Sequence, residues 1–240
     1  MNDLVAVAWK EWRELLGQRG FRGKQGIGLF LLAFGIVLPL QSGPGWITSP
    51  MTAVAWSWVP MFLVSTVIAD AIAGERERHT LETLLASRLS DDAILFGKIG
   101  AAIAYAAVVT VASLLLGLIA VNVANRGQGL VLYPLSTIVA MCVLGLLGAM
   151  LVATIGVLIS LRAATVRQAQ QTLGGTIIAL LLVPMMAVRW MPAAWKQGLL
   201  SNAVSGALLG IAALAAFVLI DAGLVALVMA RFRRAWLIAD

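Results

Sequence analysis

The sequence has few charged side chains, a single cysteine and a single histidine. Only 12% of its 240 residues are Asp, Glu, Lys or Arg, whereas about a quarter of a typical soluble domain is charged. So few charges cannot supply the polar surface that a soluble protein of this length needs. Hydrophobic residues make up 61% of the chain, and the mean hydropathy is +0.98. The composition therefore indicates an integral membrane protein.

Missing residues also exclude several kinds of site. Cys142 has no second cysteine to pair with, so neither a disulfide framework nor a cysteine metal site is expected. With one histidine and no G-x-S-x-G motif, neither a nucleophilic triad nor a zinc site is supported. The net charge of +6 lacks the long water-exposed basic domain that nucleic acid binding requires. We therefore expect no catalytic residue, no metal, no cofactor in this chain and no nucleic acid partner.

An ATPase motif is absent as well. The string GQRGFRGKQ at 17–25 is the nearest approach to G-x-x-x-x-G-K-[ST]. It has five residues between the outer glycines, no Ser or Thr after Lys24, and no preceding strand. Any ATP hydrolysis must therefore be performed by another subunit.

Six apolar segments have about the length of a membrane-spanning helix, which needs roughly 20 residues at a rise of about 1.5 Å each. They lie near 24–42, 52–73, 98–121, 136–160, 173–191 and 206–230. The fifth is the weakest because Pro184 removes a backbone donor, and whether 189–205 is re-entrant stays open. We expect an all-α membrane protein with six spans, in which residues 1–240 form one transmembrane domain.

Basic residues predict the orientation, because Lys and Arg are retained on the cytoplasmic side. With the N-terminus inside, the outer connections hold only Arg126, Arg189 and Lys196 of the 17 basic residues. Both termini are therefore expected to be cytoplasmic, as is the connection between the second and third spans. The outer connections are short, so an accessory periplasmic protein is a possible further partner.

Residues 1–20 predict an amphipathic helix at the membrane surface. Apolar residues recur there at helical spacing: Leu4, Val5, Ala8, Trp9, Trp12, Leu15 and Leu16. Trp side chains suit the headgroup boundary, and the nearby basic residues suit anionic lipid. An ordinary soluble helix packed on a partner is the alternative.

The segment GERERHTLETLLASRLSDD begins at Gly74 and is the longest stretch that looks soluble. Thr80 is a candidate N-cap of a short helix with an apolar stripe formed by Leu81, Leu84, Leu85 and Leu89. Ser90, followed by Asp91 and Asp92, predicts a second helix start that leads into the third span. From the residues alone, a solvated loop whose charges only set the topology is the more usual interpretation of such a segment in a membrane protein.

The run IAGERERHTLETLLASRLSDDAILFGK resembles the cytoplasmic connection of ABC-2 type permeases, the transmembrane subunits of ATP-binding-cassette transporters. Members of that family often carry a G-E-[RK]-E-[RK]-x-T-L-E-x-L-L stretch after the second span. The six-span count, the inside termini and the N-terminal surface helix are similar too. His79 departs from the family pattern, in which this position is usually a small residue, often Gly.

The resemblance implies a short coupling helix within a cytoplasmic coupling region, 74–97, that docks on a separate ATPase subunit, which binds ATP and Mg. It assigns coupling to these residues: Glu75, Arg76, Glu77, Arg78, Thr80, Glu82, Thr83, Leu84 and Leu85. It also implies a second permease half, in a homodimer or a heterodimer. The expected function is that of an exporter's permease subunit in a bacterial or archaeal cytoplasmic membrane.

Two acids in apolar surroundings keep other functions open. Asp221 lies deep in the sixth span, where a carboxylate costs on the order of 3 kcal/mol and normally faces a cavity or a partner. It either binds a cation or proton, as in a gradient-driven transporter or channel, or is protonated and hydrogen-bonded between helices. Asp70, near the end of the second span, is interpreted as an interfacial ion-pair member. A membrane anchor for a soluble partner is a third reading of the chain.

Two pairs of glycines mark where helices can approach closely. Gly145 and Gly148 lie in the fourth expected span, and Gly206 and Gly210 begin the sixth. Small residues at this spacing permit tight helix packing in membranes. They are weak candidates for a dimer seam.

Overall fold

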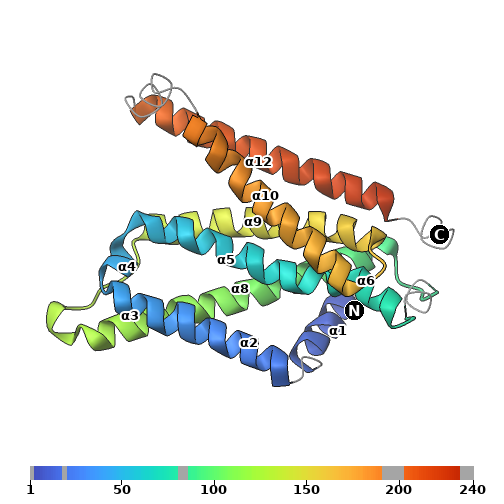
Figure 1. Ribbon diagram of the computed structural model, residues 1–240, viewed down its shortest axis with the longest axis horizontal. Coiled ribbons are helices and arrows are strands. Elements are labelled where there is room, and N and C mark those ends of the chain that lie inside the picture. Colours follow the sequence, from blue (N-terminus) through green and yellow to red (C-terminus); the bar gives the residue numbers. More distant parts are fainter. Residues whose placement is uncertain (1–2, 18–20, 81–85, 191–202, 233–240) are drawn as a thin grey trace.

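The computed structural model describes residues 3–17, 21–80, 86–190 and 203–232, and every regular element in these residues is helical (Figure 1). The expected all-α fold is therefore confirmed. The helices are α1 (Asp3–Gly17), α2 (Phe21–Leu32), η1 (Ala33–Val37), α3 (Leu38–Ser42), α4 (Gly45–Thr48), α5 (Pro50–Ile68), α6 (Asp70–Glu77), α8 (Asp91–Ala124), η2 (Arg126–Gln128), α9 (Leu135–Arg162), α10 (Val166–Trp190) and α12 (Ala203–Arg231).

Four helical stretches in the described residues are long and apolar enough to cross a membrane: Thr52–Glu77, Asp91–Ala124, Leu135–Arg162 and Gly210–Arg231. They correspond to the second, third, fourth and sixth expected spans. The first expected span corresponds to a shorter apolar helix, Ile27–Ser42. The fifth falls in α10, whose first half is polar, and it is not among the four. The structure thus supports a multi-pass membrane protein with four clear spans.

The packed core lies between α5, α8 and α9, and α5 contacts both of the other helices. Trp56 and Ile68 of α5, Ile94 of α8 and Val152 of α9 are almost fully buried in it. Close approach of α5 and α9 depends on glycines. A Cβ at Gly145 would lie 3.2 Å from the Pro60 ring. In lipid this tight packing replaces the hydrophobic effect as the main attraction between helices.

The first apolar helix changes its winding where a proline enters it. Between α2 and α3 the five-residue segment η1 is π-helical, and the Leu38 amide donates to the Ala33 carbonyl. Pro39 follows directly, and a proline ring normally clashes with the carbonyl four residues earlier, so the wider turn accommodates it. The ring rests on α8 at Gly117, where a Cβ would lie 3.1 Å from it.

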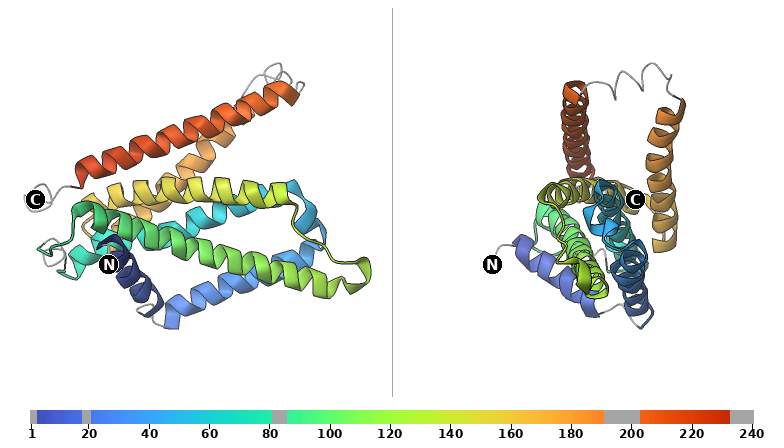
Figure 2. Two further views of the ribbon diagram at one scale, coloured as in Figure 1. Left: turned by 180° about the vertical axis from the view of Figure 1, so that it is seen from behind. Right: turned by 90° about the vertical axis from the view of Figure 1, so that its left-hand side faces the viewer.

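The helices α10 and α12 flank this core and join it at one end, through Ala169 and Leu173 of α10 and Val228 of α12. Both contact α9. They meet the bundle at the end where α6 lies and diverge from it toward the opposite end (Figures 1 and 2). In the apolar window of α12 only 11% is buried within the chain. Most of α12 is therefore available to lipid or to another subunit.

Candidate functional site

The connection between the second and third spans lies at the end of the bundle that also holds the start of α8 and the end of α9 (Figure 1). Helix α6 extends α5 into this connection and ends at Glu77. At the other side, the Ser90 hydroxyl accepts a hydrogen bond from the Ala93 amide at 3.2 Å and caps α8. The helix start predicted from Ser90 is confirmed. The expected coupling helix falls mainly on residues 81–85, which lie outside the described residues.

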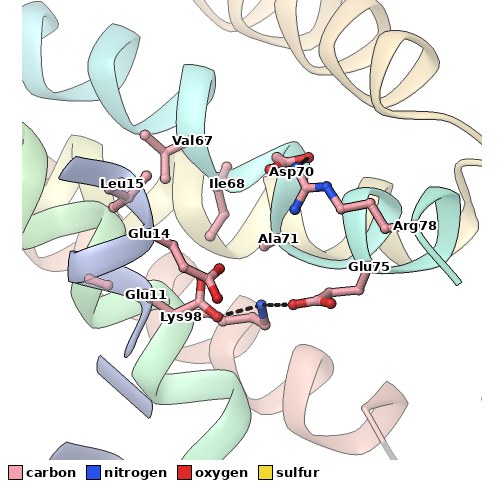
Figure 3. Close-up of a pocket in the computed structure, with 11 residues that line it drawn as sticks. Glu11, Glu14, Leu15, Val67, Ile68, Asp70, Ala71, Glu75, Arg78 and Lys98 are labelled. Carbon is pink, nitrogen blue, oxygen red and sulfur yellow. Dashed lines mark hydrogen bonds and ion pairs between the residues drawn. The ribbon is translucent and has the colours of Figure 1, made fainter. Parts of the chain in front are cut away.

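A buried lysine joins three helices at the base of the connection. The Lys98 ammonium of α8 lies 2.7 Å from Glu11 Oε1 of α1 and 3.3 Å from Glu75 Oε1 of α6 (Figure 3). Lys98 is 5% exposed and Glu75 is 6% exposed. Because ions with so little access to water need their partners, these contacts fix the positions of the three helices.

Lys10 adds a second cation to the cluster. Its ammonium lies 3.7 Å from Glu75 and 3.3 Å from Glu14. Burial alone would lower the Lys10 pKa, but the carboxylates of Glu11, Glu75 and Glu14 together raise it above its usual value. Lys10 therefore stays protonated, and α1 contributes both signs of charge to the cluster.

Helix α1 faces the bundle with more polar residues than its amphipathic pattern indicates. Val7 is buried against α8 at Gly97, where any Cβ would meet the valine side chain. Leu4, Val5 and Trp9 remain exposed, as expected for residues that face lipid. Glu11, a polar residue of α1, is thus turned toward the bundle, where it meets Lys98.

The end of α6 is closed by a left-handed residue. His79 has φ of 58°, the only positive φ of a non-glycine among the described residues. Its amide donates to the Arg76 carbonyl at 3.1 Å, and the Thr80 amide donates to the Glu75 carbonyl at 2.9 Å. This is the Schellman pattern, in which Gly is preferred at the position of His79. The departure from the family pattern therefore falls where the backbone favours glycine.

The helix that Thr80 was expected to cap would begin at residues 81–85, outside the described part of the chain, so the N-cap stays a prediction. The Thr80 hydroxyl donates to the Glu75 carboxylate, on the side of Oε2, and so points back into the charged cluster. Glu75 thereby has a partner at each oxygen, Thr80 at one and Lys98 at the other.

A serine of α9 holds the break between α5 and α6. The amides of Ile72 and Ala73 donate to Ser160 Oγ at 3.1 and 2.8 Å, and the Ser160 hydroxyl donates to the Ala69 carbonyl at 3.1 Å. A side chain that enters the backbone ladder in this way is a recognised cause of helix kinks. Ser160 is fully buried, so the break is part of the packed core.

Arg76 fastens α6 to the end of α9. Its guanidinium donates to the Ala163 carbonyl at 2.6 Å and to the Leu161 carbonyl at 2.9 Å. These are carbonyls at the C-terminal end of a helix, which lack partners within the helix and attract a cation. Arg76 is therefore engaged within the chain.

Two further predicted residues are also engaged nearby. The Val166 amide at the start of α10 donates to Glu77 at 3.1 Å, which places a carboxylate at a helix N-terminus. Asp70 forms an ion pair with Arg78 at 2.9 Å, so the ion pair expected for Asp70 is present. Desolvation opposes the charge of Arg78, but Asp70 raises its pKa above the usual value.

The remaining predicted residues lie away from this cluster or outside the described part. Glu82, Thr83, Leu84 and Leu85 lie outside the described residues, as does most of 189–205. Gly148 packs against Met61 within the chain, whereas Gly210 has nothing within 4 Å of an added Cβ. Gly206 lies in α12, but its surroundings are outside the described part.

Asp221 of α12 is 5% exposed, and neither of its carboxylate oxygens has a hydrogen-bond partner among the described residues. The described residues contain no group of three or more His, Cys, Asp or Glu side chains that could hold a metal ion.

Sequence reasoning did not identify Lys98, Glu11 or Ser160 as parts of this site. Lys98 and Glu11 are 87 positions apart, and Ser160 and Ile72 are 88 apart. Two signals were present in the sequence. One was a lysine in an otherwise apolar segment, and the other was an N-terminal amphipathic helix whose polar side could not be assigned to water or to the bundle. Neither signal names a partner.

A comparison with protein families places the chain. The model of the ABC-2 family transporter proteins matches residues 58–235, which include α6, the connection, most of the span Thr52–Glu77 and the other three clear spans in full. No curated protein and no solved structure matches the sequence. The family match covers well over half of the chain and agrees with the resemblance of the connection. The chain therefore belongs to the ABC-2 family of transporter proteins and is a membrane permease.

Proposed function

We propose that this chain is the permease subunit of an ATP-driven exporter and that the connection between α6 and α8 docks on a separate ATPase subunit. ATP and Mg are then bound by that subunit, and residues 1–240 form a single transmembrane domain. The proposal places both termini and the connection on the cytoplasmic side of a bacterial or archaeal cytoplasmic membrane. Its charge pattern, with most basic residues on one side, supports this orientation.

The observation that carries the proposal is the way the connection is anchored. Its base contacts α1 and α8 through Glu75 and α9 through Arg76, and it contacts α10 through Glu77. A solvated loop that only sets topology would need none of these contacts between helices. A segment held by four helices at its base can transmit a displacement of its tip to the spans as a rigid body.

This arrangement divides the expected coupling residues into two groups. Glu75 and Arg76 are directed into the chain, and we propose that they transmit motion to the spans. The docking surface is then formed by the distal part of the connection, to which Glu82, Thr83, Leu84 and Leu85 belong. Arg78 and Thr80 lie between the two groups.

The docking part is tested with one variant and one matched control. Glu82→Lys with Leu84→Ser and Leu85→Ser should abolish co-purification of the ATPase subunit in mild detergent while the permease still inserts. Leu130→Ser with Leu132→Ser is the control, because both leucines are highly exposed in the connection at the opposite end of the bundle. A docking variant that retained a stoichiometric ATPase would contradict the proposal.

The transmitting part is tested separately. Arg76→Gln should leave the ATPase bound, because Arg76 faces α9, but transport per ATP hydrolysed should fall. Arg88→Gln serves as the charge control, since Arg88 is an exposed residue of the same connection. Full transport in the Arg76 variant would show that the contact with α9 is not needed for coupling.

The exposed α12 supports a second permease half, since the free helix face would then be covered in the assembly. Both a second copy and a different permease fit this observation. The mass of the purified complex distinguishes a homodimer from a heterodimer.

The runner-up function is gradient-driven transport that uses Asp221. The observation in its favour is that this carboxyl is buried without a partner in the described residues. Asp221→Asn keeps the size of the side chain and removes its charge. Unchanged proton or ion dependence of transport in this variant would remove the support for this alternative.

A further inference from the structure

A second cavity lies between α9, α10 and α12, apart from the charged cluster. It is an open groove of about 880 Å³, within the range of about 300–1,000 Å³ that small-molecule sites occupy. It shares no lining residue with the cavity around Glu75 and Lys98. Its walls are the end of α9, the first turns of α10 and the end of α12.

The groove has a charged layer and an apolar layer in matching positions on two helices. Arg162 ends α9, and Leu158 lies four residues before it; Arg231 ends α12, and Leu227 lies four residues before it. Residues four apart share a helix face and are separated by about 6 Å along the axis. All four line the groove, so two guanidinium groups stand one turn beyond two leucines.

The polar side chains that line the groove favour an anion. Gln168 and Thr172 of α10 add an amide and a hydroxyl to the two guanidinium groups, and none of the described residues that line the groove carries a carboxylate. Neither Arg162 nor Arg231 has an ion pair or hydrogen bond with a described residue. Glu77, which caps α10, is occupied by the Val166 amide and is not part of the lining. The positive charge of this groove is therefore not neutralised within the described chain.

A second copy of this chain is poorly suited to neutralise it. Of the 11 acidic residues, only Asp221 and Asp240 follow Asp92, so the α9, α10 and α12 helices of another copy would bring almost no negative charge. Four acids of the first half, Glu11, Glu14, Glu75 and Asp70, already form ion pairs inside the chain. A phospholipid, in contrast, carries a phosphate and an acyl chain in the same two-layer order as the groove.

We propose that this groove binds one anionic phospholipid of the surrounding leaflet. The phosphate lies between Arg162 and Arg231, where a guanidinium can bind two phosphate oxygens, and an acyl chain lies along Leu158 and Leu227. Basic pockets between membrane helices are a known way of holding acidic headgroups. The lipid fills the space where α10 and α12 leave the bundle, independently of any role in export.

The test measures retained lipid on the full chain with its co-purifying subunits. The complex is reconstituted in nanodiscs of equal phosphatidylglycerol and phosphatidylcholine, extracted again and examined by native mass spectrometry. Wild type should retain one phosphatidylglycerol per chain in preference to phosphatidylcholine. Arg162→Gln with Arg231→Gln should lower this occupancy at least about tenfold, the effect of losing one charge-assisted hydrogen bond.

Two further variants make the result specific. Arg167→Gln removes the same charge from an exposed position of α10 that does not line the groove, and it should retain the lipid. Leu227→Trp keeps both guanidinium groups but fills the acyl layer, and it should release the lipid.

Several outcomes would overturn the proposal. Equal loss in the Arg167 variant would show general surface attraction, and retention by the double variant would place the lipid elsewhere. Displacement by millimolar inorganic phosphate alone would indicate a free-anion site. A disulfide between two chains carrying Leu227→Cys and Cys142→Ser would show that a second copy covers the groove.

Discussion

Lys98 Nζ and Glu75 Oε1 lie 3.3 Å apart in an interior where each residue is at most 6% exposed. The two residues belong to different helices and stand on either side of the charged connection. Their contact closes the base of that connection, while Glu11 attaches the N-terminal helix to the same ammonium. Burying such an ion pair costs desolvation free energy, and removing one of its two partners destabilises the protein still more.

Lys98→Met is therefore expected to destabilise the permease by about 3 kcal/mol, because Glu11 and Glu75 lose their nearest cation and keep only Lys10, at 4.0 and 3.7 Å. Combining it with Glu75→Leu should recover part of the loss, since the pair is then replaced by apolar groups. Thermal unfolding in detergent of the two single variants and the double variant forms a double-mutant cycle. Additive effects would mean that the two side chains do not interact.

His79→Gly is expected to stabilise the protein by about 1 kcal/mol, because a left-handed conformation costs an L-residue roughly 1–2 kcal/mol and a glycine little. His79→Val should do the reverse, since a β-branched residue tolerates this conformation worst. The midpoint of thermal unfolding compares the three proteins. A valine variant as stable as the glycine variant would be inconsistent with the backbone conformation of His79.

Ser160→Ala should destabilise the permease by about 1–3 kcal/mol, because it removes the partner of two buried amides and one buried carbonyl. Ser65→Ala is the matched control. The Ser65 hydroxyl lies in α5 and donates one local, exposed hydrogen bond to the Phe62 carbonyl. Its loss should change the free energy of unfolding by less than about 0.5 kcal/mol. Equal effects of the two substitutions would argue against a role for Ser160 at the break.

Gly148→Ala should lower stability, because the new Cβ would lie 2.6 Å from Met61 Cγ and force α5 and α9 apart. We expect a loss of about 1–3 kcal/mol, as for other overpacked interiors. Gly210→Ala, with open space around the new methyl group, should leave the single chain as stable as the wild type. A matched pair of unfolding curves tests both expectations. If the Gly210 variant instead weakens only the assembled complex, that glycine lies at a subunit contact.

Helix existence was predictable because apolar length and capping are local properties. The cap at Ser90 and the four clear spans follow from residues within one or two turns of each other. The first and fifth spans were less predictable. A proline and a π-helical turn interrupt the first, and a polar first half precedes the apolar part of α10.

The location of the candidate site was predictable from the sequence, but the contacts between its side chains were not. Its charged connection stands out in the sequence, and the pairing of Asp70 joins residues eight apart. The contacts of Glu75 with Lys98 and of Arg76 with α9 are different in kind, because they arise only when separate helices pack. Sequence reasoning therefore treated Glu75 and Arg76 as surface residues of the connection, whereas the structure directs both inward.

Ser160 also limits how many parts of this permease can move. Its hydroxyl bonds backbone groups at the joint of α5 and α6, so the joint within one span is held by a side chain of another. The second and fourth spans then behave mechanically as one piece, and rotation between them would break the joint. Relative motion during a transport cycle is then expected at other helix contacts, such as those where α10 and α12 separate from α9.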